Sequence, residues 1–134
     1  MTTLRIELES LALAVWKHAA ELRGELSRHS PDRRLVEEQL HEAGRRIREI
    51  WSVLDQLEKE CGRSPLEIQR LERLRELNAA LDLLCGRKHK AVRLWQSRRR
   101  DVLIAKADGL MRRARLLARA ATRVEAPPAI AAAA

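Results

Sequence analysis

The side chains with the clearest chemical potential are the arginines and lysines in the last third of the chain. Between residues 87 and 123 the only acidic residues are Asp101 and Asp108, so this stretch is strongly positive. Guanidinium groups bind phosphates and carboxylates, which predicts contact with an anion such as nucleic acid or an acidic protein face. The basic residues of the stretch are Arg87, Lys88, Lys90, Arg93, Arg98, Arg99, Arg100, Lys106, Arg112, Arg113, Arg115, Arg119 and Arg123.

The positive charge is confined to one half of the sequence. The chain has a formal net charge of +8, yet residues 1–62 hold 10 Lys and Arg against 12 Asp and Glu, whereas residues 63–134 hold 17 against 7. The simpler interpretation of this excess is a solvated basic surface, because Trp95 is the only aromatic residue within the basic stretch. If the stretch instead binds an anion, the residues expected to contact it are Arg98, Arg99, Arg100, Arg112, Arg113, Arg115 and Arg119.

Metal binding and redox chemistry have weaker candidates. Glu38 and His41 form a Glu-x-x-His pair of the kind found in metal sites of helical bundles, but those sites need the pair twice and the sequence has no second one. We therefore predict that both side chains are solvated and that the protein has no metal and no cofactor. Cys61 and Cys85 lie at the two ends of a predicted helix, about 30 Å apart, which excludes a disulfide between them.

Catalytic motifs are also lacking. The sequence contains no glycine-rich phosphate loop and no nucleophile elbow, and none of its six serines sits beside a base in a recognisable motif. We predict a protein that is not an enzyme and that has no catalytic residues.

Helices must position these side chains, and residues 36–61 give the clearest one. Apolar residues recur there at alternating steps of four and three, which places them on one face of a helix. Mostly charged and polar residues stand between them, as expected for a helix with one face in the core. The apolar seam consists of Val36, Leu40, Ala43, Ile47, Ile50, Leu54, Leu57 and Cys61.

The first two predicted helices form a hairpin. One helix is expected over residues 3–28, and Ser30, which precedes a proline, predicts the N-terminal cap of the next. Because the connection is short, the two helices should be antiparallel. In that arrangement Trp16 lies level with Gly44, and we interpret the glycine as room for the indole ring.

The organisation after the second helix has two interpretations. Gly62 is expected to be a left-handed C-terminal cap and Ser64 the N-terminal cap of a third helix. The favoured prediction is one helix over residues 65–122, bent near Gly86, because the apolar phase continues across that glycine. The alternative is a turn near Gly86 and a fourth, antiparallel helix.

The final helical stretch alternates large and small residues at heptad spacing. Small residues in every second layer let another helix approach closely, in the same molecule or in a second copy. A continuous third helix would be about 87 Å long, and the first two helices would be too short to bury the apolar face at its end. We therefore predict self-association or a partner helix on this seam. The predicted protein-binding residues are Leu103, Ala107, Leu110, Ala114, Leu117 and Ala121.

Composition indicates a single helical domain. Of the 134 residues 34% are charged, and Phe and Tyr are absent, which is typical of long helices. We predict an all-α antiparallel bundle or coiled coil of three long helices over residues 1–122, followed by a disordered Ala- and Pro-containing tail over residues 123–134. No apolar run reaches the roughly 20 residues of a membrane span and no secretory signal is recognisable, so we expect a cytoplasmic protein.

One short stretch resembles a known family. The leucine-asparagine stretch in the last long helix of the FlgN family of flagellar export chaperones is similar to Leu74, Arg75, Glu76, Leu77 and Asn78, followed by Leu83 and Leu84. The helix layout over about residues 4–95 is similar too. The resemblance implies a chaperone that holds partly unfolded hook-filament junction subunits through its C-terminal helical region. Leu81 and Asp82 stand where that family often has a second asparagine, and the basic extension from Arg98 is not typical of it.

The favoured function at this point is helix-on-helix contact with another protein, as in an export chaperone of the flagellar type. The runner-up is nucleic-acid binding by the basic stretch. A third interpretation is a structural coiled coil that assembles with copies of itself.

Overall fold

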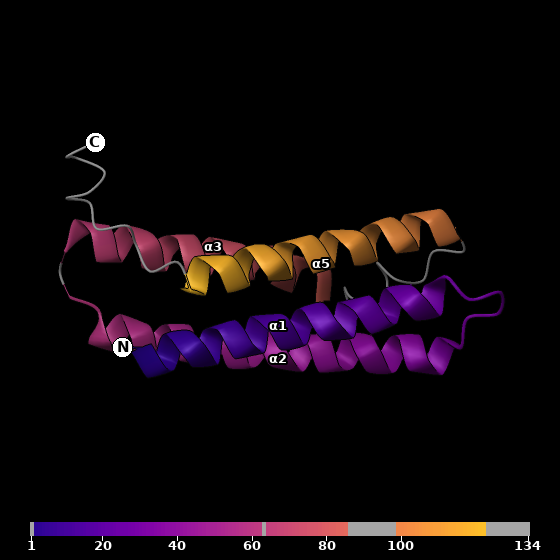
Figure 1. The fold of residues 1–134 in the computed structure, drawn as a ribbon, viewed down its shortest axis with the longest axis horizontal. Coiled ribbons are helices and arrows are strands. Elements are labelled where there is room, and N and C mark those ends of the chain that lie inside the picture. The colour runs from indigo at the N-terminus through magenta and orange to yellow at the C-terminus, as the bar shows by residue number, and fades with distance from the viewer. Residues whose placement is uncertain (1, 63, 86–98, 123–134) are drawn as a thin grey trace.

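The computed structural model of the protein describes residues 2–62, 64–85 and 99–122, and the regular secondary structure of these residues is helical. The described helices are α1 (Thr2–Leu26), α2 (Arg33–Glu60), α3 (Pro65–Cys85) and α5 (Arg100–Thr122). They run alternately in opposite directions as an elongated bundle (Figure 1). The predicted all-α fold is confirmed, whereas the predicted tail over residues 123–134 lies outside the described residues.

Helices α1 and α2 form the predicted antiparallel hairpin, with a later start of α2. Asp32 and not Ser30 is the N-terminal cap, because its backbone is extended (φ −81°, ψ 111°) and its Oδ1 accepts a hydrogen bond from the N–H of Arg34 at 3.0 Å. The N–H of Asp32 donates to Oε1 of Glu25 at 2.8 Å. The turn is therefore tied to both helices.

The connection between α2 and α3 is only partly as predicted. Cys61 is the C-terminal cap of α2 in an extended conformation (φ −67°, ψ 130°). The left-handed cap predicted at Gly62 is wrong, because no described glycine has a positive φ. Ser64 does precede α3 as expected, and its carbonyl oxygen accepts from the N–H of Ile68 at 3.1 Å.

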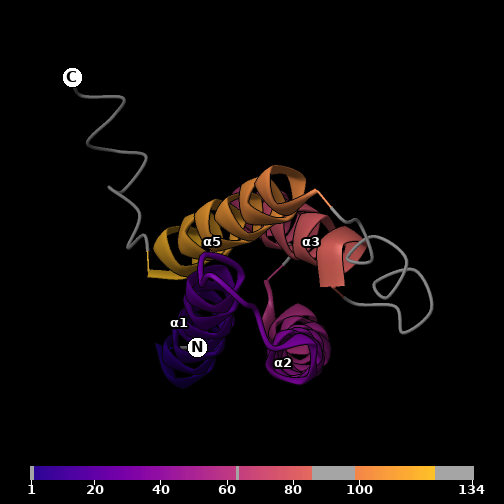
Figure 2. The ribbon, with the colours of Figure 1, turned by 90° about the vertical axis from the view of Figure 1, so that its right-hand side faces the viewer.

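The favoured prediction of one helix over residues 65–122 is wrong. Helix α3 ends at Cys85, and α5 returns antiparallel to it and packs against both α3 and α1 (Figures 1 and 2). A continuous helix could not bring these segments into contact, so the alternative with a fourth antiparallel helix is correct. Burial of the apolar seam of α5 against α1 supplies the driving force. Gly86 lies outside the described residues.

Seen end-on, the four described helices stand at the corners of a four-sided bundle (Figure 2). Helix α1 contacts α2 and α5, and α3 also contacts α2 and α5. Their inner faces form one apolar core to which every described helix contributes, including the predicted seam of α2 except the half-buried Cys61. Small residues let α1 and α5 pack closely. The fully buried alanines of these two helices are Ala12, Ala19, Ala107 and Ala114.

Gly44 makes room for α3 and not for Trp16. A Cβ atom at Gly44 would lie 2.9 Å from the carbonyl oxygen of Cys85, and no atom of Trp16 is among its three nearest neighbours. Trp16 contacts α5 instead. The interpretation of this glycine as space for an indole ring is therefore wrong, and the close approach is between the backbones of α2 and α3.

Candidate functional site

The residues predicted to bind another protein lie inside the bundle. All six are buried, and α5 packs with this face against α1 and α3. The partner helix predicted from the alternation of large and small residues is thus α1 of the same chain. In this fold none of the six is accessible to a second molecule, and no intermolecular partner is needed to cover them. They are Leu103, Ala107, Leu110, Ala114, Leu117 and Ala121.

The outer surface in the second half of α5 is formed by arginines. Arg112, Arg115 and Arg119 recur at steps of three and four on the side away from the buried seam, and all three are exposed. Leu116 stands between them and is also exposed. From Arg112 to Arg119 the row extends about 10 Å along the helix axis. We call these four residues the arginine face.

An aromatic ring of α1 supports one of these arginines. The guanidinium carbon of Arg115 lies 5.5 Å from the ring centroid of Trp16, which is a cation–π contact. Trp16 is half-buried and packs against the apolar core. The ring therefore holds the guanidinium group at the outer edge of the contact between α1 and α5, while the arginine stays exposed to solvent.

Arg113 folds back along its own helix. A Cβ atom at Gly109 would lie 2.8 Å from Nη1 of Arg113, so the missing side chain of the glycine gives the guanidinium group room. By helical periodicity Arg113 points to one side of the arginine face. It adds to the positive charge of this surface without joining the row.

Carboxylates neutralise the first half of α5 but not the second. Asp108 forms an ion pair with Arg23 of α1, and Asp101 forms one with Arg99. Residues 109–122 contain no carboxylate. Within the described part of the chain, no carboxylate oxygen lies within 4.0 Å of a guanidinium nitrogen of the arginine face. Among the described side chains, none forms an ion pair that compensates the charge of these three arginines.

The described helices differ in net charge in the same sense. Helix α5 holds six Lys and Arg against two Asp and Glu, a balance of +4. Each of α1, α2 and α3 has one more acidic than basic residue. The positive potential of the described helices is thus centred on α5, on its second half in particular.

The structure divides the seven arginines that the sequence predicts as anion contacts. Those of the second half of α5 come together. Arg100, at the opposite end of the helix, donates from Nη2 to the carbonyl oxygen of His29 at 3.0 Å, and Arg99 pairs with Asp101. Arg98 lies outside the described residues. The candidate site therefore keeps four of the seven: Arg112, Arg113, Arg115 and Arg119.

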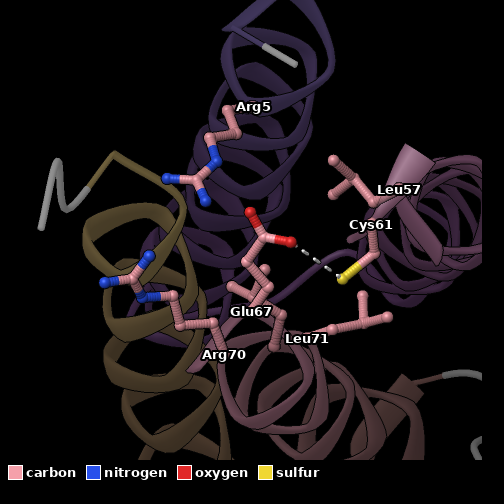
Figure 3. A pocket seen from close by; sticks show the side chains of 7 residues that line it. Arg5, Leu57, Cys61, Glu67, Arg70 and Leu71 are labelled. Atoms are coloured by element: carbon pink, nitrogen blue, oxygen red, sulfur yellow. Dashed lines mark hydrogen bonds between the residues drawn. The ribbon is translucent and has the colours of Figure 1, made fainter. Parts of the chain in front are cut away.

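A small hollow lies where the start of α1, the end of α2 and the start of α3 meet (Figure 3). Glu67 lies between Arg5 and Cys61 in this view, and Sγ of Cys61 is 3.9 Å from Oε2 of Glu67. The hollow gives water about 30 Å³, room for one or two molecules, whereas organic ligands occupy sites of about 300 to 1,000 Å³. It is too small for an organic substrate or cofactor.

No metal cluster or reactive thiol stands out among the described residues. No group of three or more His, Cys, Asp or Glu side chains there could hold a metal ion. Glu38 and His41 are both exposed on α2. Cys61 and Cys85 are free thiols. Burial, with a smaller contribution from Asp82, raises the pKa of Cys85 from 9.0 to about 12, so this thiol stays protonated and weakly nucleophilic at neutral pH.

Two features of the site and its support were not predicted from the sequence. Asn78 is fully buried, donates from Nδ2 to the carbonyl oxygen of Ile47 at 3.4 Å, and its Oδ1 has no hydrogen-bond partner in the described part of the chain. It follows Leu74 by four residues, so helical periodicity could have placed it in the core. The contact of Trp16 with Arg115 had no comparable signal, because it depends on α5 being a separate helix.

Comparisons of this chain with protein-family models, with curated proteins and with solved structures find no match. None of the described helices combines the length and the apolar character that a membrane span requires.

Proposed function

We propose that this protein is a non-enzymatic helical bundle that binds nucleic acid through the arginine face of α5. One observation carries the proposal. Arg112, Arg115 and Arg119 form an exposed row about 10 Å long, and no described carboxylate lies close enough to neutralise them. Phosphates that contact such a row release their condensed counterions, which is the main source of sequence-independent affinity for nucleic acid.

The composition of the face favours phosphate over a protein surface. The central part of a protein–protein interface is enriched in aromatic residues and methionine as well as in arginine, whereas this face combines three arginines with a single leucine and no aromatic residue of its own. The planar guanidinium group matches two phosphate oxygens at once. We therefore place nucleic acid before an acidic protein, which reverses the order expected from the sequence.

The chaperone function implied by the FlgN resemblance has less physical support. It would use the C-terminal helical seam, and α1 covers that seam here. A flagellar subunit could bind there only if α5 separated from α1 and exposed residues such as Leu110 and Leu117, which are fully buried. A coil that assembles through the same seam with copies of itself has the same requirement. Both functions therefore rank below nucleic-acid binding.

Binding of DNA at increasing salt tests the proposal. Fluorescence anisotropy with a labelled duplex of about 20 base pairs should show a log–log salt slope near −2.7, at about −0.9 for each of three phosphates contacted. The triple variant Arg112→Gln, Arg115→Gln, Arg119→Gln should bind at least about tenfold more weakly at ~150 mM salt and show a flatter slope. Circular dichroism should show an unchanged fold, because these side chains are exposed.

A matched control removes the same charge from another helix. Arg33, Arg34 and Arg48 are exposed on α2, and their joint change to Gln lowers the net charge equally. This control should keep most of the affinity. An equal loss of DNA affinity in both triple variants would show that binding depends only on total charge. It would contradict the proposal that the arginine face is the binding site. Wild-type protein that binds an acidic protein but no DNA would transfer the function to protein contact.

A further inference from the structure

Among the described residues, no exposed aromatic ring lies beside the arginine face. Trp16 is half-buried, and the guanidinium group of Arg115 covers its ring. Trp51, the other tryptophan in the described part of the chain, is half-buried on α2, diagonally across the bundle from α5 (Figure 2). Neither of the two described tryptophans therefore offers a free ring on which a nucleic-acid base at this surface could stack.

This arrangement distinguishes between two forms of nucleic acid. Proteins that bind single strands without sequence preference combine a positive groove with aromatic side chains on which successive bases stack. The arginine face supplies only the positive charge. Duplex DNA needs no such rings because its bases are already stacked, and it carries one charge per about 1.7 Å of axis, so about six phosphates of its two strands lie along 10 Å of its axis. A single strand presents fewer charges over the same length.

The rigidity of the face points in the same direction. Leu110, Ala114 and Leu117 are fully buried beneath the row and fix α5 against α1, so the backbone positions of the arginines are set by the core. A straight, fixed row suits a stiff partner, and duplex DNA has a persistence length of about 50 nm. A flexible strand would lose conformational entropy to align with it.

We infer that the partner of the arginine face is the phosphate backbone of duplex nucleic acid and not a single strand. This inference rests on the proposed function and adds the form of the ligand. Trp16 has a positioning role in it, because its ring holds Arg115 in the row and is thereby withdrawn from stacking with a base. The surface discriminates by charge density and stiffness, without an aromatic platform.

A direct comparison of two DNA probes tests the inference. Labelled oligonucleotides of equal length, one a duplex and one an unstructured thymidine strand, are titrated with the full chain at ~150 mM salt. The duplex should bind about tenfold more tightly, and both affinities should fall in the triple arginine-to-glutamine variant.

A second variant adds the feature that the face lacks. Leu116→Trp places an aromatic ring at the edge of the row, beside Arg112 and Arg119, at a position that is already exposed. It should raise the affinity for the single strand several-fold and change the affinity for the duplex little, because only unpaired bases can stack on the new ring. Leu83→Trp on α3, where Leu83 is also exposed, is the matched control and should change neither affinity.

The outcomes separate the two proposals. Tighter or equal binding of the single strand, abolished by the triple variant, would overturn the duplex preference and leave nucleic-acid binding by this face standing. A failure of Leu116→Trp to favour the single strand would show that stacking does not limit binding here and would also count against the inference. Absence of binding to either probe would overturn both.

Discussion

Helix α3 packs against α2 and helix α5 packs against α1, so each covers one half of the hairpin that α1 and α2 form (Figure 2). On α5 Leu110 and Leu117 are completely buried, and Leu103 keeps 9% of its surface exposed. On α3 Leu81 is completely buried, whereas the leucines at 71, 74 and 77 each keep 7–8% of their surface exposed, and Asn78 takes up a core position. Most core leucines of α3 are therefore slightly more exposed than those in the second half of α5.

The difference follows from residue size and polarity. Alanines at every second layer let α5 approach α1 closely, and Ala12 and Ala19 of α1 match them. Helix α3 presents mainly leucines and a buried amide, and its last residue approaches the backbone of α2 closely at Gly44. The helix that carries the arginine face is therefore also the more closely packed one.

The largest effect should come from truncating a leucine of each helix. Leu110→Ala on α5 should lower the free energy of unfolding by about 3 to 5 kcal/mol, and Leu74→Ala on α3 by about 2 kcal/mol, because the fully buried side chain loses more contacts. Urea denaturation measures both. An equal or larger loss for Leu74→Ala would show that α3 is held as firmly as α5.

A smaller effect is expected where α3 meets α2. Gly44→Ala places a Cβ atom 2.9 Å from a backbone carbonyl oxygen, so α3 must shift, and stability should fall by about 1 to 3 kcal/mol. Gly24→Ala is the matched control on α1, where a Cβ atom would meet nothing within 4 Å, and it should be neutral or stabilising by up to about 1 kcal/mol. Thermal melting that ranks the two variants in the opposite order would contradict the close approach.

The smallest effect concerns the buried amide. Asn78→Leu removes an oxygen that has no partner in the described residues together with one long hydrogen bond to Ile47, and we expect a stabilisation of about 1 kcal/mol. A clear destabilisation in urea would instead mean that the amide is fully satisfied, for example by water. A stabilised variant would make α3 more like α5 and reduce the contrast between them.

Periodicity predicted the inner faces of these helices well. The seams of α2, apart from Cys61, and of α5 are buried as their spacing indicates, because each is set by residues within one helix. Placement of the caps was less accurate. Asp32 rather than Ser30 caps α2, and nothing in the local residue types distinguishes the two.

The relation between helices could not be derived from periodicity. An apolar phase that continues from α3 into α5 is compatible with one long helix and with two antiparallel ones, and burial against α1 decides between them. The arginine face was visible in the sequence as Arg112, Arg115 and Arg119. The lack of nearby carboxylates could not be seen in the sequence, because it depends on how the helices pack, as in the ion pair between Arg23 of α1 and Asp108 of α5.

The buried thiol at the end of α3 has a consequence for kinetics. Since the raised pKa keeps Cys85 protonated, an alkylating reagent at pH 8 can react with it readily only in molecules where the end of α3 has moved away from α2. Mass spectrometry can measure the rate of its modification relative to that of the half-buried Cys61. This rate then reports how often the bundle opens at the end of α3. Between pH 9 and 12 the unfolded chain releases this proton before the folded one does, so the same residue also makes opening easier as the solution becomes more alkaline.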